Sequence, residues 1–206
     1  MRPLAVHIIG NTCVGKSTLG LALAEEFGGT YVSFGDRKRM HIRDGTDLGR
    51  AINDAVSAGV PIAPSLCVML MQDALTTGWN FLSGCPISLE ELKSLNAVCE
   101  TVCALHLCVE EDVLYRRFMQ RGVCPYCHRT GTRGAWCPNH DVALGPRIDA
   151  TQSEWVARQR LYHDRIAPFA AVLATRVPVW EVMVGSMNVS QIVAKVAMWI
   201  HQRSVQ

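Results

Sequence analysis

The stretch that decides the fold is GNTCVGKS, residues Gly10 to Ser17. It fits the pattern G-x-x-x-x-G-K-[ST], and it stands directly after an apolar run and at the start of a helical pattern. In such a loop, glycines let backbone N–H groups turn inward around phosphate oxygens, and the helix N-terminus adds partial positive charge. The side chain of Lys16 would reach the outer phosphates, and the hydroxyl of Ser17 would hold Mg²⁺. The sequence therefore predicts a nucleoside triphosphate site formed by Gly10, Asn11, Thr12, Cys13, Val14, Gly15, Lys16, Ser17 and Thr18.

Outward from this loop, short apolar runs alternate with longer amphipathic ones. The apolar runs are residues 4–10, 30–34, 79–82, 102–109 and 177–184. All are apolar enough to be buried on both faces of a parallel sheet. Helical patterns cover residues 16–27, 47–58, 64–75, 111–121, 153–173 and 189–203. We therefore expect an α/β fold, a P-loop NTPase-type five-stranded parallel sheet flanked by helices.

Two stretches exceed a plain alternation of strand and helix. Residues 33–63 carry extra helical residues, and residues 122–150 are rich in Gly, Pro, Cys and Arg. The chain has 206 residues, and its 49% apolar content can fill the core of one domain. We therefore expect a single domain over residues 1–206, with insertions at 33–63 and 122–150.

Charge and the N-terminal residues limit the partners. A formal net charge of +2 gives no broad basic face, so we expect no nucleic-acid partner. The apolar start, residues 4–10, is too short for a membrane span and lacks the cleavage site of a signal peptide. We expect a cytoplasmic monomer with no membrane partner.

The cysteine pattern indicates a metal site inside the second insertion. Cys124-x-x-Cys127 and Cys137-x-x-His140 each place two ligands in a tight turn. Four such ligands suit a closed, tetrahedral Zn²⁺ site, which is structural because no position stays open for water. His128 could replace one ligand, and Asp141 is a more distant candidate. The alternative is an unmetallated loop with reactive thiols, and we interpret the remaining cysteines as small buried residues.

The first insertion carries a family resemblance. Ser33-Phe-Gly35-Asp36-Arg-Lys-Arg39 resembles the monophosphate-binding motif S-T-G-D-x-L-R of the adenylate kinase family, and the glycines that follow it continue the pattern. A basic run alone is more often a solvated face. The resemblance implies that Arg39 grips the acceptor phosphate, which suits a bidentate guanidinium. The insertion at 33–63 would then bind the acceptor.

The resemblance continues to the C-terminal part of the chain. VEEDVLYRRFMQRG, residues 109–122, is similar to the helix that leads into that family's lid, and residues 147–149 and 158–161 resemble its R-x-D-D and R-x-R-L motifs. Residues 122–150 would then form a zinc-bound lid. Several arginines converging on the transferred phosphoryl group would stabilise its charge. The catalytic residues that this implies are Lys16, Arg117, Arg121, Arg147 and Arg160.

The chain departs from the family at the end of its third apolar run. Where the family has D-G-F-P-R-T, this chain has Ser83-Gly-Cys-Pro-Ile87-Ser, so a carboxylate near Mg²⁺ and an acceptor arginine are both replaced. The position that reads the base falls on Glu91, which would favour a partner with two donors, such as a guanine edge. Alternatively, Glu91 is exposed on its helix. The acceptor-binding residues implied are Phe34, Gly35, Asp36, Arg39, Gly84 and Glu91.

These patterns favour one reaction. We expect an ATP-dependent phosphotransferase of adenylate kinase type that transfers the γ-phosphoryl group to a nucleoside monophosphate, with structural Zn²⁺ and with Mg²⁺ accompanying ATP. The partners would be ATP and a small phosphorylated acceptor. Two alternatives stay open, a kinase for a non-nucleotide phosphate or phosphonate acceptor and a catalytically weakened nucleotide-binding protein.

Overall fold

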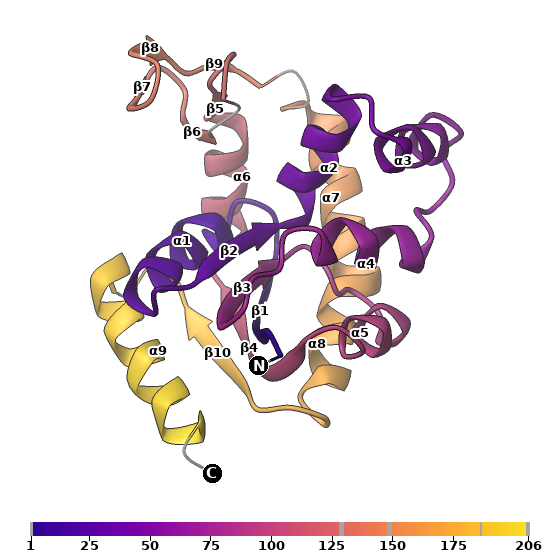
Figure 1. Cartoon of the computed structure of the whole chain (residues 1–206). Coiled ribbons are helices and arrows are strands. Elements are labelled where there is room, and N and C mark those ends of the chain that lie inside the picture. The colour runs from indigo at the N-terminus through magenta and orange to yellow at the C-terminus, as the bar shows by residue number, and fades with distance from the viewer. Residues whose placement is uncertain (1, 128–129, 148–149, 186, 205–206) are drawn as a thin grey trace.

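The computed structural model describes residues 2–127, 130–147, 150–185 and 187–204 (Figure 1). Its centre is a five-stranded parallel sheet in the order β10-β4-β1-β3-β2. The strands are β1 Leu4–Gly10, β2 Thr30–Ser33, β3 Trp79–Ser83, β4 Glu100–Cys108 and β10 Val179–Met183. They coincide with the five apolar runs, which confirms the predicted fold class.

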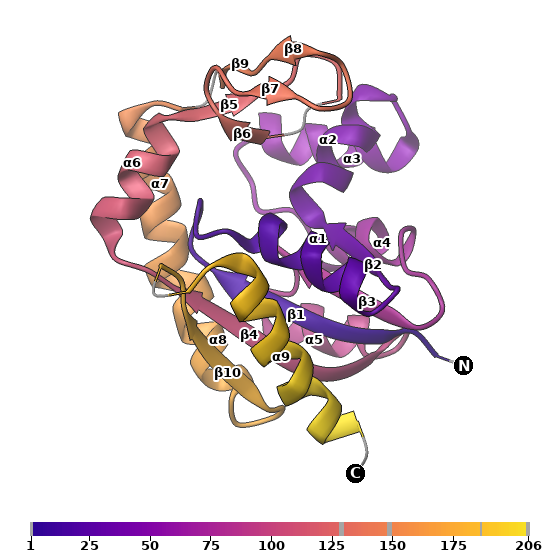
Figure 2. The ribbon, with the colours of Figure 1, turned by 90° about the vertical axis from the view of Figure 1, so that its left-hand side faces the viewer.

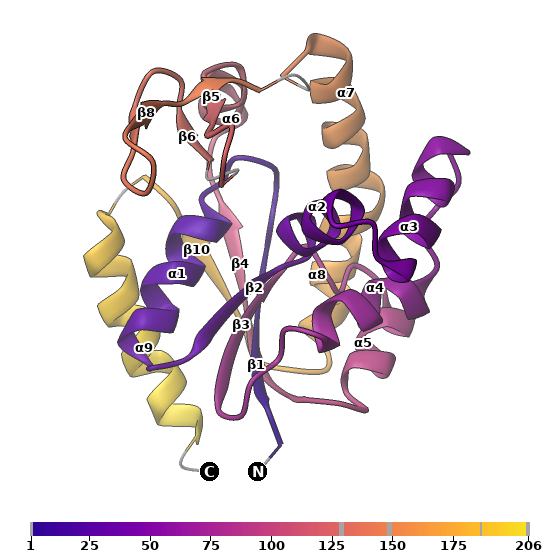
Figure 3. The same ribbon diagram turned by 45° about the horizontal axis from the view of Figure 1, so that its top comes forward.

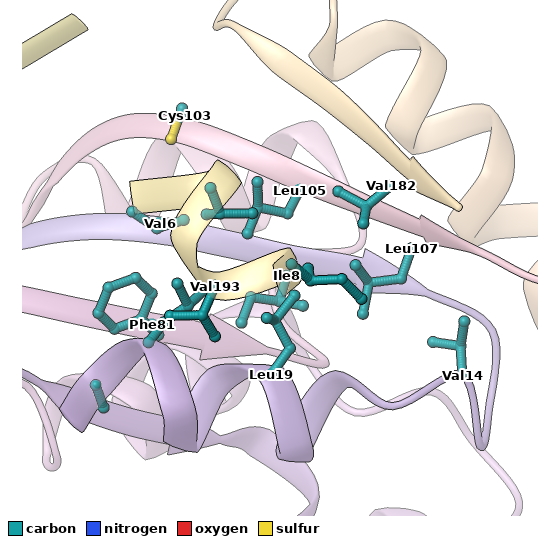
Figure 4. Close-up of a cluster of buried hydrophobic side chains, with 14 of the residues drawn as sticks. Val6, Ile8, Val14, Leu19, Phe81, Cys103, Leu105, Leu107, Val182 and Val193 are labelled. Carbon is teal, nitrogen blue, oxygen red and sulfur yellow. The ribbon is translucent and has the colours of Figure 1, made fainter. Parts of the chain in front are cut away.

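Helices cover both faces of the sheet, as Figure 3 shows. The helices on one face are α1 Lys16–Glu26 and α9 Val189–Ser204, and those on the other are α4 Pro64–Gln72, α5 Leu89–Leu95 and α8 Ala167–Leu173. Successive side chains of a strand point to opposite faces, so the side chains of β1 pack alternately against the two layers of helices. Val6 and Ile8 pack with Phe81, Leu105 and other side chains beneath α1 and α9 (Figure 4). Ala5 and Ile9 face the opposite layer.

Four of the six cysteines outside the metal motif are buried, as predicted: Cys67, Cys85, Cys99 and Cys103. Cys13 and Cys108 are only half-buried. Among the described residues, no helix has the length and apolar character that a bilayer span requires.

The stretch after β2 forms two helices, α2 Phe34–Arg43 and α3 Asp47–Ser57. Each begins at a hydroxyl cap, since Ser33 accepts from the N–H of Asp36 and Thr46 accepts from the N–H of Gly49. The helices are in close contact at Gly49, where an added Cβ would lie 2.0 Å from the carbonyl oxygen of His41.

Small strands follow α6 Glu111–Met119 and lie above the carboxyl-terminal end of the sheet (Figure 2). They are β5 Arg121–Val123, β6 Thr130–Thr132, β7 Trp136–Cys137, β8 Val142–Ala143 and β9 Gly145–Pro146. β5 pairs with both β6 and β9, and β7 pairs with β8, all antiparallel. We call residues 121–147 the lid segment.

The helix predicted over 153–173 consists of three pieces. α7 Gln152–Leu161 passes into a π-helical turn, η1 Tyr162–Ile166, before α8 begins. Pro168 lacks the N–H that a continuous α-helix needs and crowds the preceding turn, which accounts for a wider turn at this point.

Candidate active site

A cleft of about 590 Å³ lies at the carboxyl ends of β1 and β3. Four parts of the chain line it: the loop between β1 and α1, the first turns of α2, the end of β3, and the lid segment with the adjoining turns of α6 and α7. Open α/β folds bind their ligands in a crevice just outside the carboxyl ends of the parallel strands. The phosphate, acceptor and lid motifs of the sequence therefore meet in one cavity.

The backbone of the phosphate loop explains its residue types. Gly10 has φ +146°, and a Cβ there would lie 2.6 Å from the carbonyl oxygen of Leu107. Gly15 has φ +109°, and Cys13 occupies the left-handed region with φ +62°. Only glycine adopts the first two conformations without strain. Val14 is buried in the core and does not line the cleft, so its side chain supports the loop from below.

Side chains fix the loop on both sides. The Nζ of Lys16 donates to the carbonyl oxygens of Gly10, at 2.9 Å, and Asn11, at 2.6 Å. Asn11 also donates from Nδ2 to the Oε1 of Gln159 in α7, at 2.6 Å. The loop is therefore held in its turn, with the lysine folded back onto it.

Burial, together with the positive charges of Arg121 and Arg158, lowers the pKa of Lys16 to about 8, and Cys13 opposes this shift. A phosphate anion at the loop would favour the charged ammonium form. An anionic ligand at the loop would therefore raise the pKa of Lys16.

Three predicted arginines line the cleft: Arg117, Arg121 and Arg147. Arg160 does not, because it is exposed on α7, whereas Arg158 lines the cleft in its place. Two residues along an α-helix are about 200° apart around its axis, so both cannot face the same cavity. Of the two arginines in the R-x-R-L motif, Arg158 lines the cavity and the predicted Arg160 does not.

The acceptor residues Phe34, Gly35, Asp36, Arg39 and Gly84 line the same cleft. The guanidinium of Arg39 donates to the carboxylate of Asp36. Lys38 lines the cleft as well, and burial lowers its pKa, together with the charges of Arg158 and Arg39. Lys38 belongs to the basic run but not to the predicted acceptor residues, because only the rotation of α2 about its axis distinguishes it from Arg37. Arg37 turns away and bonds Asp73 at the end of α4.

Glu91 is not a lining residue of the cleft and is only 4% exposed. Its carboxylate accepts from the backbone N–H of Ile87, at 2.7 Å, and lies 3.7 Å from the thiol of Cys85. The side chain of Glu91 therefore neither reaches the cleft, where it would read a base, nor lies exposed on its helix, the two alternatives that the sequence left open. The physical reason is the cap at Ser88, which places Glu91 in the first turn of α5, beneath residues 84–87. Glu91 instead supports the loop whose Ile87 lines the cleft.

Three hydroxyl groups form a hydrogen-bonded chain at Ser83, the position at which the adenylate kinase motif has a carboxylate. Tyr31 donates to the Oγ of Ser17 at 3.0 Å, and its oxygen lies 2.7 Å from the Oγ of Ser83. The ring of Tyr31 packs over Gly20, where a Cβ would lie 2.3 Å from it. Asp36 is the one carboxylate among the described residues that line the cleft. Tyr31 therefore holds the hydroxyl of Ser17 in position at the wall of the cleft.

The metal motif comes together in the lid segment. The donor atoms of Cys124, Cys127, Cys137 and His140 all lie within 4.8 Å of one another. Cys127 and Cys137 have sulfur atoms 3.5 Å apart, and the Nδ1 of His140 is 3.8 Å from the sulfurs of both Cys124 and Cys137. Ligands at zinc distances of about 2.1–2.3 Å in a tetrahedron are separated by about 3.5–3.8 Å. These four residues therefore fit Zn²⁺.

The alternative ligands do not join this group. Asp141 is exposed and lies outside it, and His128 lies outside the described residues. Burial opposes ionisation of Cys124, but hydrogen bonds from the backbone of Cys127 and Tyr126 prevail and lower its pKa. The thiolate is the form that binds zinc, so this environment favours the metal.

No family model matches the chain. Curated relatives are adenylate kinases, including those of Kosmotoga olearia, 24% identical over 179 residues, and Acetivibrio thermocellus, 28% identical over 179 residues. The alignments cover 79% of this chain and 83% of the first relative, and 78% and 82% for the second. An adenylate kinase of Thermoanaerobacter sp. is 27% identical over 136 residues, which are 62% of this chain and 63% of the relative.

Proposed function

We propose that the chain is an ATP-dependent phosphotransferase that acts on a nucleoside monophosphate, as its similarity to adenylate kinases over 179 residues suggests. The observation that carries this proposal is the convergence of one lysine and four arginines on the cleft of the phosphate loop. These are Lys16, Arg117, Arg121, Arg147 and Arg158. Such a set suits a reaction in which charge spreads over the oxygens of a phosphoryl group.

In the proposed reaction, the loop amides and Lys16 hold the outer phosphates of ATP. An oxygen of the acceptor phosphate attacks the γ-phosphorus in line, and the bond to the bridging oxygen breaks to release ADP. No general base is needed, since the attacking phosphate oxygen is already anionic. Mg²⁺ supplied with ATP would neutralise charge between the phosphates, and Ser17 would hold it. The arginines exclude water and stabilise the equatorial oxygens.

Lys38 and Arg39 would bind the acceptor phosphate from α2. The family arginine at the end of β3 is Ile87 here, so the half-buried cation of Lys38 offers a second charge from a different element. Arg158 also lines the cleft, and its charge helps to lower the pKa of Lys38. We therefore propose that this end of the cleft selects its acceptor mainly by negative charge.

A second acceptor class is favoured by the position of Glu91. Since its carboxylate is turned to Ile87 and Cys85, the side chain at the base-reading position does not reach the cleft. A small non-nucleotide phosphate or phosphonate would not need that contact. It would use the same two cations of α2.

The lid segment completes the proposal. Cys124, Cys127, Cys137 and His140 would hold one structural zinc, and the braced segment would bring Arg121 and Arg147 over the phosphates. All four ligands come from the protein, so the ion would take no part in the chemistry.

The test is the release of ADP by the zinc-loaded chain with MgATP and a panel of nucleoside monophosphates, small phosphorylated acids and phosphonates. Acceptor-dependent ADP formation that Lys16→Ala abolishes is the expected result. Unchanged activity in Lys16→Ala would refute the donor site. Binding of ATP without turnover on any acceptor would instead support a weakened nucleotide-binding protein.

A further inference from the structure

A second group of metal-binding side chains lies at the edge of the sheet, outside the cleft. His106 and Cys108 are two residues apart on β4 and therefore share a face, and Glu181 of β10 is paired in register with His106. Their donor atoms all lie within 4.8 Å of one another. Figure 2 shows the ends of β4 and β10 side by side, next to α7 and α8. None of the three belongs to the phosphate, acceptor or lid motifs.

Tyr162 orients the imidazole of this group. Its hydroxyl lies 3.0 Å from the Nε2 of His106. In the tautomer that carries its proton on Nε2, this nitrogen donates to the hydroxyl and Nδ1 keeps a lone pair for a metal. That Nδ1 is 3.9 Å from the sulfur of Cys108, close to the separation of about 3.6 Å between nitrogen and sulfur ligands of one tetrahedral zinc. Tyr162 is the first residue of the π-helical turn η1, and such turns often occur at functional sites. A partner that fixes the second ring nitrogen is typical of metal-binding histidines.

The surroundings leave room for an ion. His106 and Cys108 are half-buried and Glu181 is exposed, so the group is accessible from solvent. A cavity of about 130 Å³ borders Cys108 and Tyr162, but neither His106 nor Glu181 lines it, so an ion would reach the group from the solvent side. Thiolate, imidazole and carboxylate together suit zinc and its borderline neighbours rather than Mg²⁺ or Ca²⁺.

We propose that His106, Cys108 and Glu181 form a second site for a zinc-class divalent cation, with three protein ligands and a fourth position open to water or an external ligand. This arrangement differs from the closed lid site, in which the protein fills all four positions. The side chain of Tyr162 is a positioning residue, because it acts through His106.

The test is a Zn²⁺ titration, against a chromophoric chelator, of the chain already brought to one tightly bound zinc. We expect a further equivalent in the wild-type chain, its loss in Cys108→Ser, and affinity about tenfold lower in Tyr162→Phe. His201→Gln serves as the matched control, since His201 is exposed on α9 and outside the group, and it should bind as the wild type does. A wild-type chain that takes no further zinc, or a Cys108→Ser chain that takes it equally well, would overturn the proposal.

A second measurement needs no variant. Zn²⁺ should slow alkylation of Cys108 in the native wild-type chain, followed by peptide mass spectrometry, while leaving Cys13 unaffected. Equal alkylation of Cys108 with and without Zn²⁺ would overturn the proposal even if every variant misfolded.

Discussion

The parallel sheet and the lid segment are ordered by different forces. The sheet buries large apolar clusters against helices on both faces. The described part of the lid segment buries one small cluster, Cys124, Cys137 and Leu144, and two of these are candidate zinc ligands. Burial on that scale cannot offset the entropy of ordering a segment, whereas a bound ion can. The loop that would hold ATP thus rests on the core, whereas we expect the lid segment to depend on a bound metal.

Removing the metal should give the largest effect. Chelation of zinc, or Cys124→Ser, should open the lid segment, because structural zinc binding contributes on the order of 10 kcal/mol to such modules. Hydrogen exchange should show loss of protection across 121–147 and unchanged protection in β1 and β4. Cys99→Ser, which alters a buried cysteine of the sheet core, should not expose the lid selectively. A metal-free chain with a fully protected lid would contradict this comparison.

The second largest effect is expected from a glycine substitution in the phosphate loop, compared with one in the lid segment. Gly10→Ala would place a methyl group 2.6 Å from the backbone oxygen of Leu107 at φ +146°, so the loop must distort. ATP affinity, measured by calorimetry, should fall by about 3 kcal/mol, or more than 100-fold. Gly131→Ala in the lid would meet only the end of the Leu144 side chain, at 2.7 Å, which can rotate away. Its effect on ATP affinity should stay below about 1 kcal/mol, and a larger loss there than at Gly10 would reverse the comparison.

The two arginines of α7 give a matched test of the cleft. Arg158→Lys should reduce kcat about 100-fold, since it removes a guanidinium aimed at the proposed transition state. Arg160→Lys should change kcat less than about twofold, because that side chain is exposed and outside the cleft. Steady-state kinetics of both variants, with the acceptor found by the panel, would separate them. Equal losses would mean that α7 turns when the cleft closes.

The smallest predicted effect is one of pH. The pKa of Lys16 is lowered to about 8 without ligand, and a phosphate favours the charged form, so ATP affinity should be constant below pH 8 and fall above it. About a tenfold loss is expected between pH 7 and pH 9. Lys16→Arg should flatten the profile, since arginine does not titrate in this range. If the ATP affinity of the wild type depended on pH as little as that of the variant, the pKa of Lys16 would not be lowered by burial, and the prediction would fail.

Much of the fold could be predicted from the sequence. All five strands of the central sheet follow the apolar runs, because burial on both faces of a parallel sheet requires continuous apolar residues. The division of the helix expected over 153–173 could not be predicted in the same way. Its apolar periodicity continues through Tyr162, and only the backbone shows the π-helical turn before Pro168.

Part of the candidate site was beyond the sequence for the same reason. Local patterns gave Lys16 and Ser17, but the hydroxyl of Tyr31 comes to Ser17 from another strand. Ser83 completes that chain from a third strand. Contacts between strands depend on sheet order, and no local spacing encodes it.

The sequence by itself determined the phosphate loop, the parallel sheet and the pairing of ligands in the metal motif. Each depends on residue types a few positions apart, and their conformations follow from local sterics and burial. Only the tertiary structure decided that Arg158 and Lys38 enter the cleft while Arg160, Arg37 and Glu91 do not. Those outcomes depend on the rotation of each helix about its axis, which is set by the packing of the whole domain rather than by its own residues.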